Sequence, residues 1–179
     1  IMSPDESTRK AYLDKWAEYV GEGHRIVKFV PASGAASRMF KNLFAFLDAS
    51  YDVPTTDFDK HFFDNIEHFA FRKALCEKCK ANEGLSVCKL IEAGRYKDVV
   101  ANLLLSKGLN YGQLPKGLLL FHEYEDGMRT PMEEHLVEAA LYAQSEGQAH
   151  VHFTVSHEHL AFFEKMVEEK LPYYEKKFA

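Results

Sequence analysis

The stretch "RIVKFVPASGAASRMFK", from Arg25 to Lys41, decides the fold that we predict for this chain. Its opening segment, "RIVKFV", is mainly apolar, which is typical of a strand buried in a parallel sheet. A turn of small residues follows, and residues 35–48 then repeat apolar side chains at helical spacing. A strand, a tight turn and a helix in this order predict an α/β fold.

Two later apolar segments extend the pattern, at residues 117–122 and 150–155. A helix is predicted after the first of them, where Thr130 caps, Pro131 takes the first helical position and Glu133 completes a capping box. Ser156 is expected to cap a last helix that runs to about Leu171. We therefore predict a three-layer sandwich with a mainly parallel sheet, whose strands lie at 25–30, 117–122 and 150–155.

A helical segment separates the first predicted strand from the second. Apolar residues recur at helical spacing over 57–81, and shorter helices are expected near 86–93 and 96–106. We predict a helical insert over 50–113, with 1–49 and 114–179 together forming one α/β half-domain. A further helix is predicted at 4–20, capped by Ser3 with Pro4 at its first position.

The composition excludes several classes of protein. The net charge is −5 and the pI is about 6.0, so no basic face for nucleic acid is expected. No apolar run approaches the ~20 residues that cross a bilayer, and the first residues lack a signal peptide's apolar segment. Three cysteines, with Cys76 and Cys79 in a helical pattern, predict reduced thiols that pack as small apolar residues in a cytoplasmic protein.

The turn after the first strand is the candidate binding site. Ligands of open α/β sheets bind beyond the carboxyl ends of the strands, and a helix N-terminus attracts anions. We predict phosphate binding by Ala32, Ser33, Gly34, Ala35, Ala36, Ser37 and Arg38. The alternative is a tight turn that binds nothing, with Arg38 paired to a surface carboxylate. The P-loop, dinucleotide and nucleophile-elbow motifs are all absent from the sequence.

Four histidines offer a second candidate site. His150 and His152 alternate along a predicted strand, and His157 and His159 follow shortly afterwards. Imidazoles are common ligands of transition metals, but no H-E-x-x-H spacing occurs. We assign no metal ligand here, and a metal site at these histidines stays an open alternative.

Three segments carry a resemblance to known enzymes: "PASGAASRM" (Pro31 to Met39), "PKGLLLF" (Pro115 to Phe121) and "RTPMEEHLVEA". Together they resemble the sugar-nucleotide pyrophosphorylases, a group of nucleotidyltransferases with a GT-A-like fold. The resemblance implies catalytic roles for Arg38 and Lys116, and it makes Glu134 and His135 packing residues. The chain is still more similar to an uncharacterised bacterial family that shares these segments and "HFTVS". That family is longer, so the chain is expected to be its N-terminal part.

The resemblance also implies a reaction. A sugar 1-phosphate would attack the α-phosphorus of a nucleoside triphosphate, with magnesium as cofactor and pyrophosphate leaving. Arg38 would hold the leaving phosphates and Lys116 would neutralise charge at the α-phosphate or the incoming phosphate. We expect Lys116 to lie near the turn, because both are predicted at strand edges that the sheet could bring together. No residue here matches the enzymes' magnesium-binding aspartate, and a helical insert separates Arg38 from Lys116. The alternative is a non-catalytic α/β module that binds a nucleotide or a protein. The base, the sugar and the oligomeric state are left open.

Overall fold

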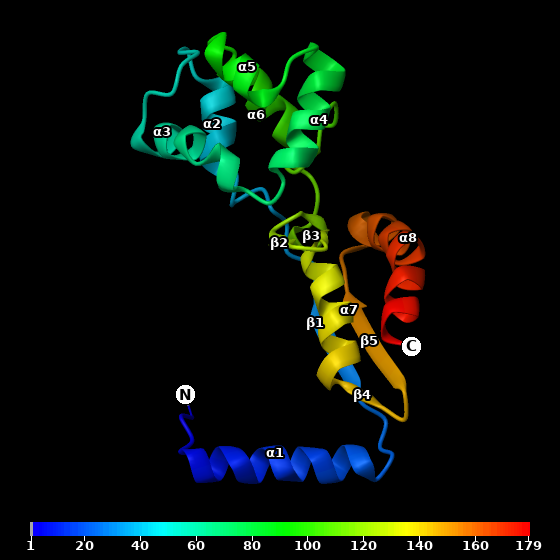
Figure 1. Cartoon of the computed structure of the whole chain (residues 1–179). Coiled ribbons are helices and arrows are strands. Elements are labelled where there is room, and N and C mark those ends of the chain that lie inside the picture. Colours follow the sequence, from blue (N-terminus) through cyan, green and yellow to red (C-terminus); the bar gives the residue numbers. More distant parts are fainter. Residues whose placement is uncertain (1) are drawn as a thin grey trace.

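The chain folds into two parts that are joined by a narrow junction, and a further helix extends from one end (Figure 1). The computed structural model describes residues 2–179. The helices are α1 (Glu6–Gly21), α2 (Lys41–Asp48), α3 (Asp57–Asp64), α4 (Arg72–Glu83), α5 (Val87–Glu92), α6 (Tyr96–Leu104), α7 (Pro131–Tyr142) and α8 (Leu160–Phe178), with short 3-10 turns η1 (Ile66–His68), η2 (Lys116–Leu118) and η3 (His157–His159). The strands are β1 (Val27–Pro31), β2 (His122–Tyr124), β3 (Gly127–Arg129), β4 (Gln144–Ser145) and β5 (Gln148–Thr154).

The sheet part consists of β1, β5 and β4, in that order, together with α7 and α8. β1 and β5 pair in parallel, with Val27 opposite His150 and Pro31 opposite Thr154; their parallel sense is as predicted, and their direct pairing and register are findings of the structure. β4 pairs with β5 in the antiparallel sense. The mixed α/β class of the fold is thereby confirmed.

One face of this sheet is covered and the other is bare. Helix α7 lies on the first face, where Lys28 of β1 forms an ion pair with Glu138 of α7. On the other face, Val27 and Phe29 are 45% and 63% exposed. Within residues 2–179 no helical layer covers this second face.

The predicted strand at 117–122 is wrong. Residues 116–118 form the 3-10 turn η2, and His122 begins a short antiparallel hairpin of β2 and β3 instead. The reason lies in the burial of two adjacent leucines, because Leu118 packs in the sheet part and Leu119 in the helical core. Gly117 lies against Phe163, where a Cβ would come within 3.0 Å of the ring. The apolar run thus crosses between two cores and does not join the sheet.

The helical lobe comprises α2 to α6 and carries the larger core. Helix α2 belongs to this lobe, since Leu43 and Phe46 are 2% and 1% exposed within it. The predicted helix over 35–48 begins only at Lys41, so the prediction is wrong for its first turns. The buried residues of this core are Ala36, Phe40, Leu43, Phe46, Phe62, Phe63, Ile66, Phe71, Leu75, Cys79, Val87, Leu90, Val99, Val100, Leu103, Leu104, Tyr111 and Leu119.

Two terminal helices differ from their predicted limits. Helix α1 is capped by Asp5, whose carboxylate accepts a hydrogen bond from the Thr8 amide at 2.8 Å, and Ser3 does not serve as the cap. Helix α8 continues through Pro172 to Phe178. Its last turns are held by Tyr174, which is 4% exposed and donates to Glu133 Oε1 at 3.2 Å. None of the helices in residues 2–179 has both the length and the apolarity needed to traverse a bilayer.

Candidate functional site

The turn after β1 lies at the junction, which consists of residues 32–40 and 115–121 (Figure 1). The Ala32 amide still continues the sheet pattern, donating to the Thr154 carbonyl at 2.8 Å. Ala35 then forms an isolated antiparallel bridge with Pro115. Because α2 starts only at Lys41, residues 32–38 do not form the N-terminus of a helix. The helix dipole that the sequence analysis assigned to this turn therefore does not act there.

Lys116 lies beside the turn, as the sequence analysis expected. Its amide donates to the Gly34 carbonyl at 3.0 Å, so this prediction of proximity is confirmed. The two segments border a cavity of about 220 Å³ at the carboxyl end of β1. The cavity is lined by Val30, Pro31, Ala32, Gly34, Lys116, Gly117, Pro131, Met132, His135, Phe153 and Phe163.

The other predicted site residues lie in different surroundings. Ser33, Ala35, Ser37 and Arg38 are exposed and do not line this cavity. Among residues 2–179, Arg38 has no ion-pair partner, so the alternative of a structural surface pair is not seen. The side chain of Ala36 is 0% exposed and packs in the core of the helical lobe. Ala36 consequently anchors the turn and is not accessible to a ligand through its side chain.

Gly34 is the residue at which the backbone of the turn is most open. A Cβ built on Gly34 would meet no atom within 4 Å, and its φ does not lie in the left-handed region. Neither strain nor crowding inside this chain therefore requires glycine at position 34. Since Gly34 lines the cavity, its missing side chain leaves room for a group that approaches the backbone.

His135 is a site residue that the sequence analysis missed. It lines the same cavity as Lys116 and belongs to α7, and it had been assigned to packing. Its Nδ1 lies 2.9 Å from Glu138 Oε2, and Lys28 Nζ lies 2.5 Å from the same oxygen. A carboxylate only accepts hydrogen bonds, so the Nδ1–H donates and Nε2 is left without a protein partner in residues 2–179. The sequence did contain a signal for this role of His135, because Glu138 follows three positions later on the same helical face and can orient the imidazole.

The charges of this cluster stabilise one another. The hydrogen bond from Lys28 lowers the pKa of the Glu138 carboxyl below its usual value; burial opposes this effect and His135 adds to it. Burial alone would lower the pKa of Lys28, but the hydrogen bond and charge of Glu138 raise it overall. Glu138 is thus held ionised, which fixes the tautomer and orientation of His135 toward the cavity.

The cavity does not fit a magnesium ion. Magnesium prefers carboxylate and other oxygen ligands, and no Asp or Glu lines the cavity. Across residues 2–179, no three His, Cys, Asp or Glu side chains come together as a possible metal site. Of the four histidines considered above, His159 is 6% exposed and its Nδ1 lies 2.8 Å from the Ser156 hydroxyl, whereas His152 and His157 are exposed. The three cysteines are free thiols, and burial raises the pKa of Cys79 to about 11.

Comparison with known proteins identifies the family. The chain matches the family model described as a domain of unknown function, DUF4301, over residues 1–179, and it belongs to that family. No curated protein and no solved structure matches the chain. The resemblance to sugar-nucleotide pyrophosphorylases finds no support in these comparisons and stays a prediction.

Proposed function

We propose that the turn after β1 binds the phosphate groups of a nucleoside triphosphate together with Lys116. The observation that carries this proposal is the hydrogen bond of 3.0 Å from the Lys116 amide to the Gly34 carbonyl. It joins a cationic residue, which lies far along the chain, to an open backbone segment at the carboxyl end of a parallel strand. That end of a strand is where α/β sheets bind their ligands.

Each residue has a distinct role in the proposed site. Lys116 supplies a compact positive charge at the cavity, and Arg38 supplies a planar fork of donors that suits phosphate oxygens. Gly34 admits the ligand to the backbone. His135 offers Nε2, which accepts a hydrogen bond when the ring is neutral and donates one to phosphate when it is protonated.

The reaction proposed for the site is nucleotidyl transfer to a sugar 1-phosphate. The phosphate oxygen of the sugar attacks the α-phosphorus, the bond to the bridging oxygen breaks, and pyrophosphate leaves. Such transfer needs positioning and charge stabilisation more than it needs a protein nucleophile. The cations at the junction provide charge of the required sign. No step is assigned to magnesium, because no carboxylate lines the cavity.

Two structural features belong to the same proposal. The bare face with Val27 and Phe29 would be covered in the working protein, which would complete a three-layer sandwich. The free thiols accord with a cytoplasmic setting, where nucleoside triphosphates are available.

A second function is favoured by one observation. The absence of a carboxylate from the cavity lining is what a module that binds nucleotide without turnover would show. Incubation with a nucleoside triphosphate and a sugar 1-phosphate separates the two functions. Release of pyrophosphate supports the transferase, and binding without release supports the module.

The binding site is tested by calorimetric titration of ATP, CTP, GTP and UTP. A charge-assisted hydrogen bond is worth roughly 1.5–3 kcal/mol, so Arg38→Ala should weaken binding by about 10- to 150-fold. Arg38→Lys should restore part of the affinity, because lysine lacks the planar fork. Arg9→Ala is the matched control, since Arg9 is an exposed arginine of α1.

Two results would contradict the proposal. If none of the four nucleotides binds at about millimolar concentration, the site does not take a nucleoside triphosphate. If Arg38→Ala binds as tightly as Arg9→Ala, then Arg38 has no part in the site. A melting temperature equal to that of the wild type shows that a loss of affinity is not a loss of fold.

A further inference from the structure

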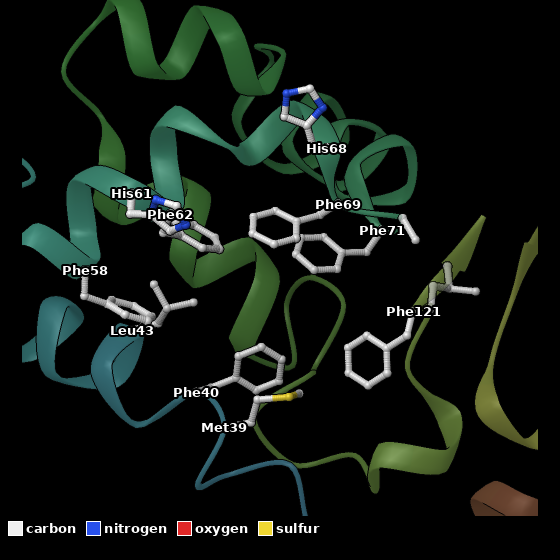
Figure 2. Close-up of a pocket in the computed structure, with 12 residues that line it drawn as sticks. Met39, Phe40, Leu43, Phe58, His61, Phe62, His68, Phe69, Phe71 and Phe121 are labelled. Carbon is white, nitrogen blue, oxygen red and sulfur yellow. The ribbon is translucent and has the colours of Figure 1, made fainter.

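A second cavity lies in the helical lobe, next to the junction but apart from the phosphate site. Its volume is about 380 Å³, and Figure 2 shows apolar side chains facing one space from α2, α3, the segment before α4 and the segment before β2, with the ring of His68 pointing away from it. It is lined by Met39, Phe40, Leu43, Phe58, His61, Phe62, His68, Phe69, Ala70, Phe71, Leu120 and Phe121. We call it the aromatic cavity, because six of these residues are phenylalanine.

The rings of the aromatic cavity are ordered among themselves. Phe62 stacks on Phe69 with centroids 5.4 Å apart, and Phe69 stacks on Phe71 at 5.0 Å with planes within 10°. Figure 2 shows these rings on one side and Phe40 and Phe121 on another. The result is a groove with walls of aromatic carbon.

This cavity is not a gap in the packing of the lobe. The side chains at its base are buried, with Leu43, Phe62 and Phe71 at 2%, 7% and 5% exposure. At its rim, Met39 and Phe58 are 42% and 40% exposed to water. Exposed apolar surface costs roughly 25 cal/mol per Å², so a concave apolar patch above an intact core points to a ligand.

We propose that the aromatic cavity binds the hydrocarbon chain of a carboxylic acid of about ten to fifteen carbons. A cavity of about 150 Å³ holds the six carbons of benzene, so a cavity of about 380 Å³ accommodates about fifteen carbons at that density. A nucleobase or a sugar would leave its polar atoms unpaired against this lining, which disfavours both. An acyl chain needs no hydrogen bonds and gains from every buried methylene.

The polar side chains of the lining indicate which head group the ligand carries. They are the imidazoles of His61 and His68, and the lining contains no Asp or Glu. Both histidines are exposed, and His61 Nδ1 lies 3.4 Å from Asn65 Nδ2, which leaves its Nε2 free of that contact. Imidazole N–H groups donate to a carboxylate, and protonated imidazole also attracts its charge. A carboxylate at the mouth of the cavity therefore complements the imidazole of His61, whereas Figure 2 shows the ring of His68 pointing away from the cavity.

The experiment is calorimetric titration of the full chain with decanoic acid, with 1-decanol as the uncharged comparison. Saturable binding of one decanoate per chain is expected, and the acid should bind more tightly than the alcohol. Ala70→Trp places an indole in the cavity, and we expect it to weaken decanoate binding at least about tenfold. Ala81→Trp is its control, because Ala81 is exposed on α4 and does not line the cavity.

A second variant keeps the test decisive if Ala70→Trp fails to fold. Phe58→Glu places a carboxylate at the rim in the first turn of α3, where an acid favours the helix. It should also weaken decanoate binding at least about tenfold, whereas Leu85→Glu, outside the cavity, should not.

Several results would overturn the proposal. Absence of saturable decanoate binding below about 1 mM excludes this ligand class. If decanoate and decanol bind with equal affinity, the cavity does not recognise the carboxylate group of the ligand. Binding that survives both cavity variants places the ligand elsewhere. Self-association that Phe58→Glu abolishes, without decanoate binding, makes the surface a contact between two copies. Arg38→Ala should leave decanoate affinity unchanged, so this proposal and the nucleotide site fail independently.

Discussion

The helical lobe and the sheet part bury their side chains in different ways. The lobe has a continuous apolar core from α2 to α6, and it includes Leu75, Leu90 and Leu103 at 0% exposure. In the sheet part, the corresponding apolar cluster of buried residues is Leu118, Met132 and Phe163. The candidate phosphate site lies at the junction of the two. The lobe therefore holds one end of the turn in place through the buried side chains of Ala36 and Phe40, and strand β1 leads into the other end.

Polar contacts join helices in both parts. Glu133 is 3% exposed and accepts hydrogen bonds from the Thr130 amide at 2.9 Å and from the Tyr174 hydroxyl at 3.2 Å. Lys170 Nζ lies 3.4 Å from the same carboxyl group. These contacts tie α7 to α8, and in the lobe Asn102 of α6, which is 0% exposed, likewise donates to Glu83 Oε1 of α4 at 3.1 Å. The two parts therefore differ in the size of their apolar cores, so they should respond differently to the loss of apolar carbon.

The largest expected effect is on the core of the lobe. Leu103→Ala removes a side chain that is 0% exposed and should lower the free energy of unfolding by about 2–5 kcal/mol. Leu141→Ala in the sheet part is the matched change, because Leu141 is 65% exposed, and it should alter stability by at most about 0.5 kcal/mol. Urea unfolding followed by circular dichroism measures both. An equal loss of unfolding free energy for the two variants would contradict the assignment of Leu103 to the core and of Leu141 to the surface.

A smaller effect on the free energy of unfolding is expected from alkaline pH, and it concerns a buried tyrosine of the lobe. Burial raises the pKa of Tyr111 to about 12, although the hydrogen bond from the Leu120 amide opposes the rise. The folded state thus prefers the neutral phenol. Its contribution is present below about pH 10, the ordinary pKa of tyrosine, and is lost as the pH rises through about 12. Raising the pKa of Tyr111 from about 10 to about 12 in the folded state corresponds to about 2.7 kcal/mol of unfolding free energy.

The measurement is unfolding free energy between pH 9 and 12, for the wild type and for Tyr111→Phe. The variant loses the hydrogen bond to Leu120, so it should be less stable at neutral pH by about 1 kcal/mol. Its stability should then fall less steeply in alkali than that of the wild type. Identical alkaline slopes for both proteins would mean that Tyr111 is not a buried, neutral residue of the lobe.

Some features could be predicted because their signals are local, and others because the order of strands and helices along the chain restricts how they can be arranged. The capping box of Thr130 and Glu133 is present as predicted, with Pro131 at the start of α7. The parallel sense of β1 and β5 followed from apolar strands linked through helices, whereas their direct pairing was not predicted. Lys116 was placed near the turn because both were expected at strand edges; the structure confirms that proximity, although residues 116–118 form a 3-10 turn and not a strand.

Other features depend on contacts that no local pattern contains. The run from Gly117 to His122 is as apolar as a strand, but its leucines are divided between two cores. The helix predicted from residue 35 starts at Lys41, because Ala36 and Phe40 are drawn into the lobe. His135 became a candidate site residue only when the fold placed it at the same cavity as Lys116. Tertiary packing decided each of these cases.

The smallest effect on stability is expected at the junction, for a substitution of Gly34. The same substitution tests whether phosphate binds at the turn after β1. Gly34→Ala adds a methyl group where no atom lies within 4 Å, so stability should be unchanged or rise by up to about 1 kcal/mol. If phosphate approaches the backbone of the turn, the same methyl group should weaken nucleoside triphosphate binding by about tenfold or more. Calorimetric titration beside a melting curve gives both values. A stable Gly34→Ala protein with reduced affinity is the predicted result, and one that binds the nucleotide as tightly as the wild type would contradict a phosphate site at this turn.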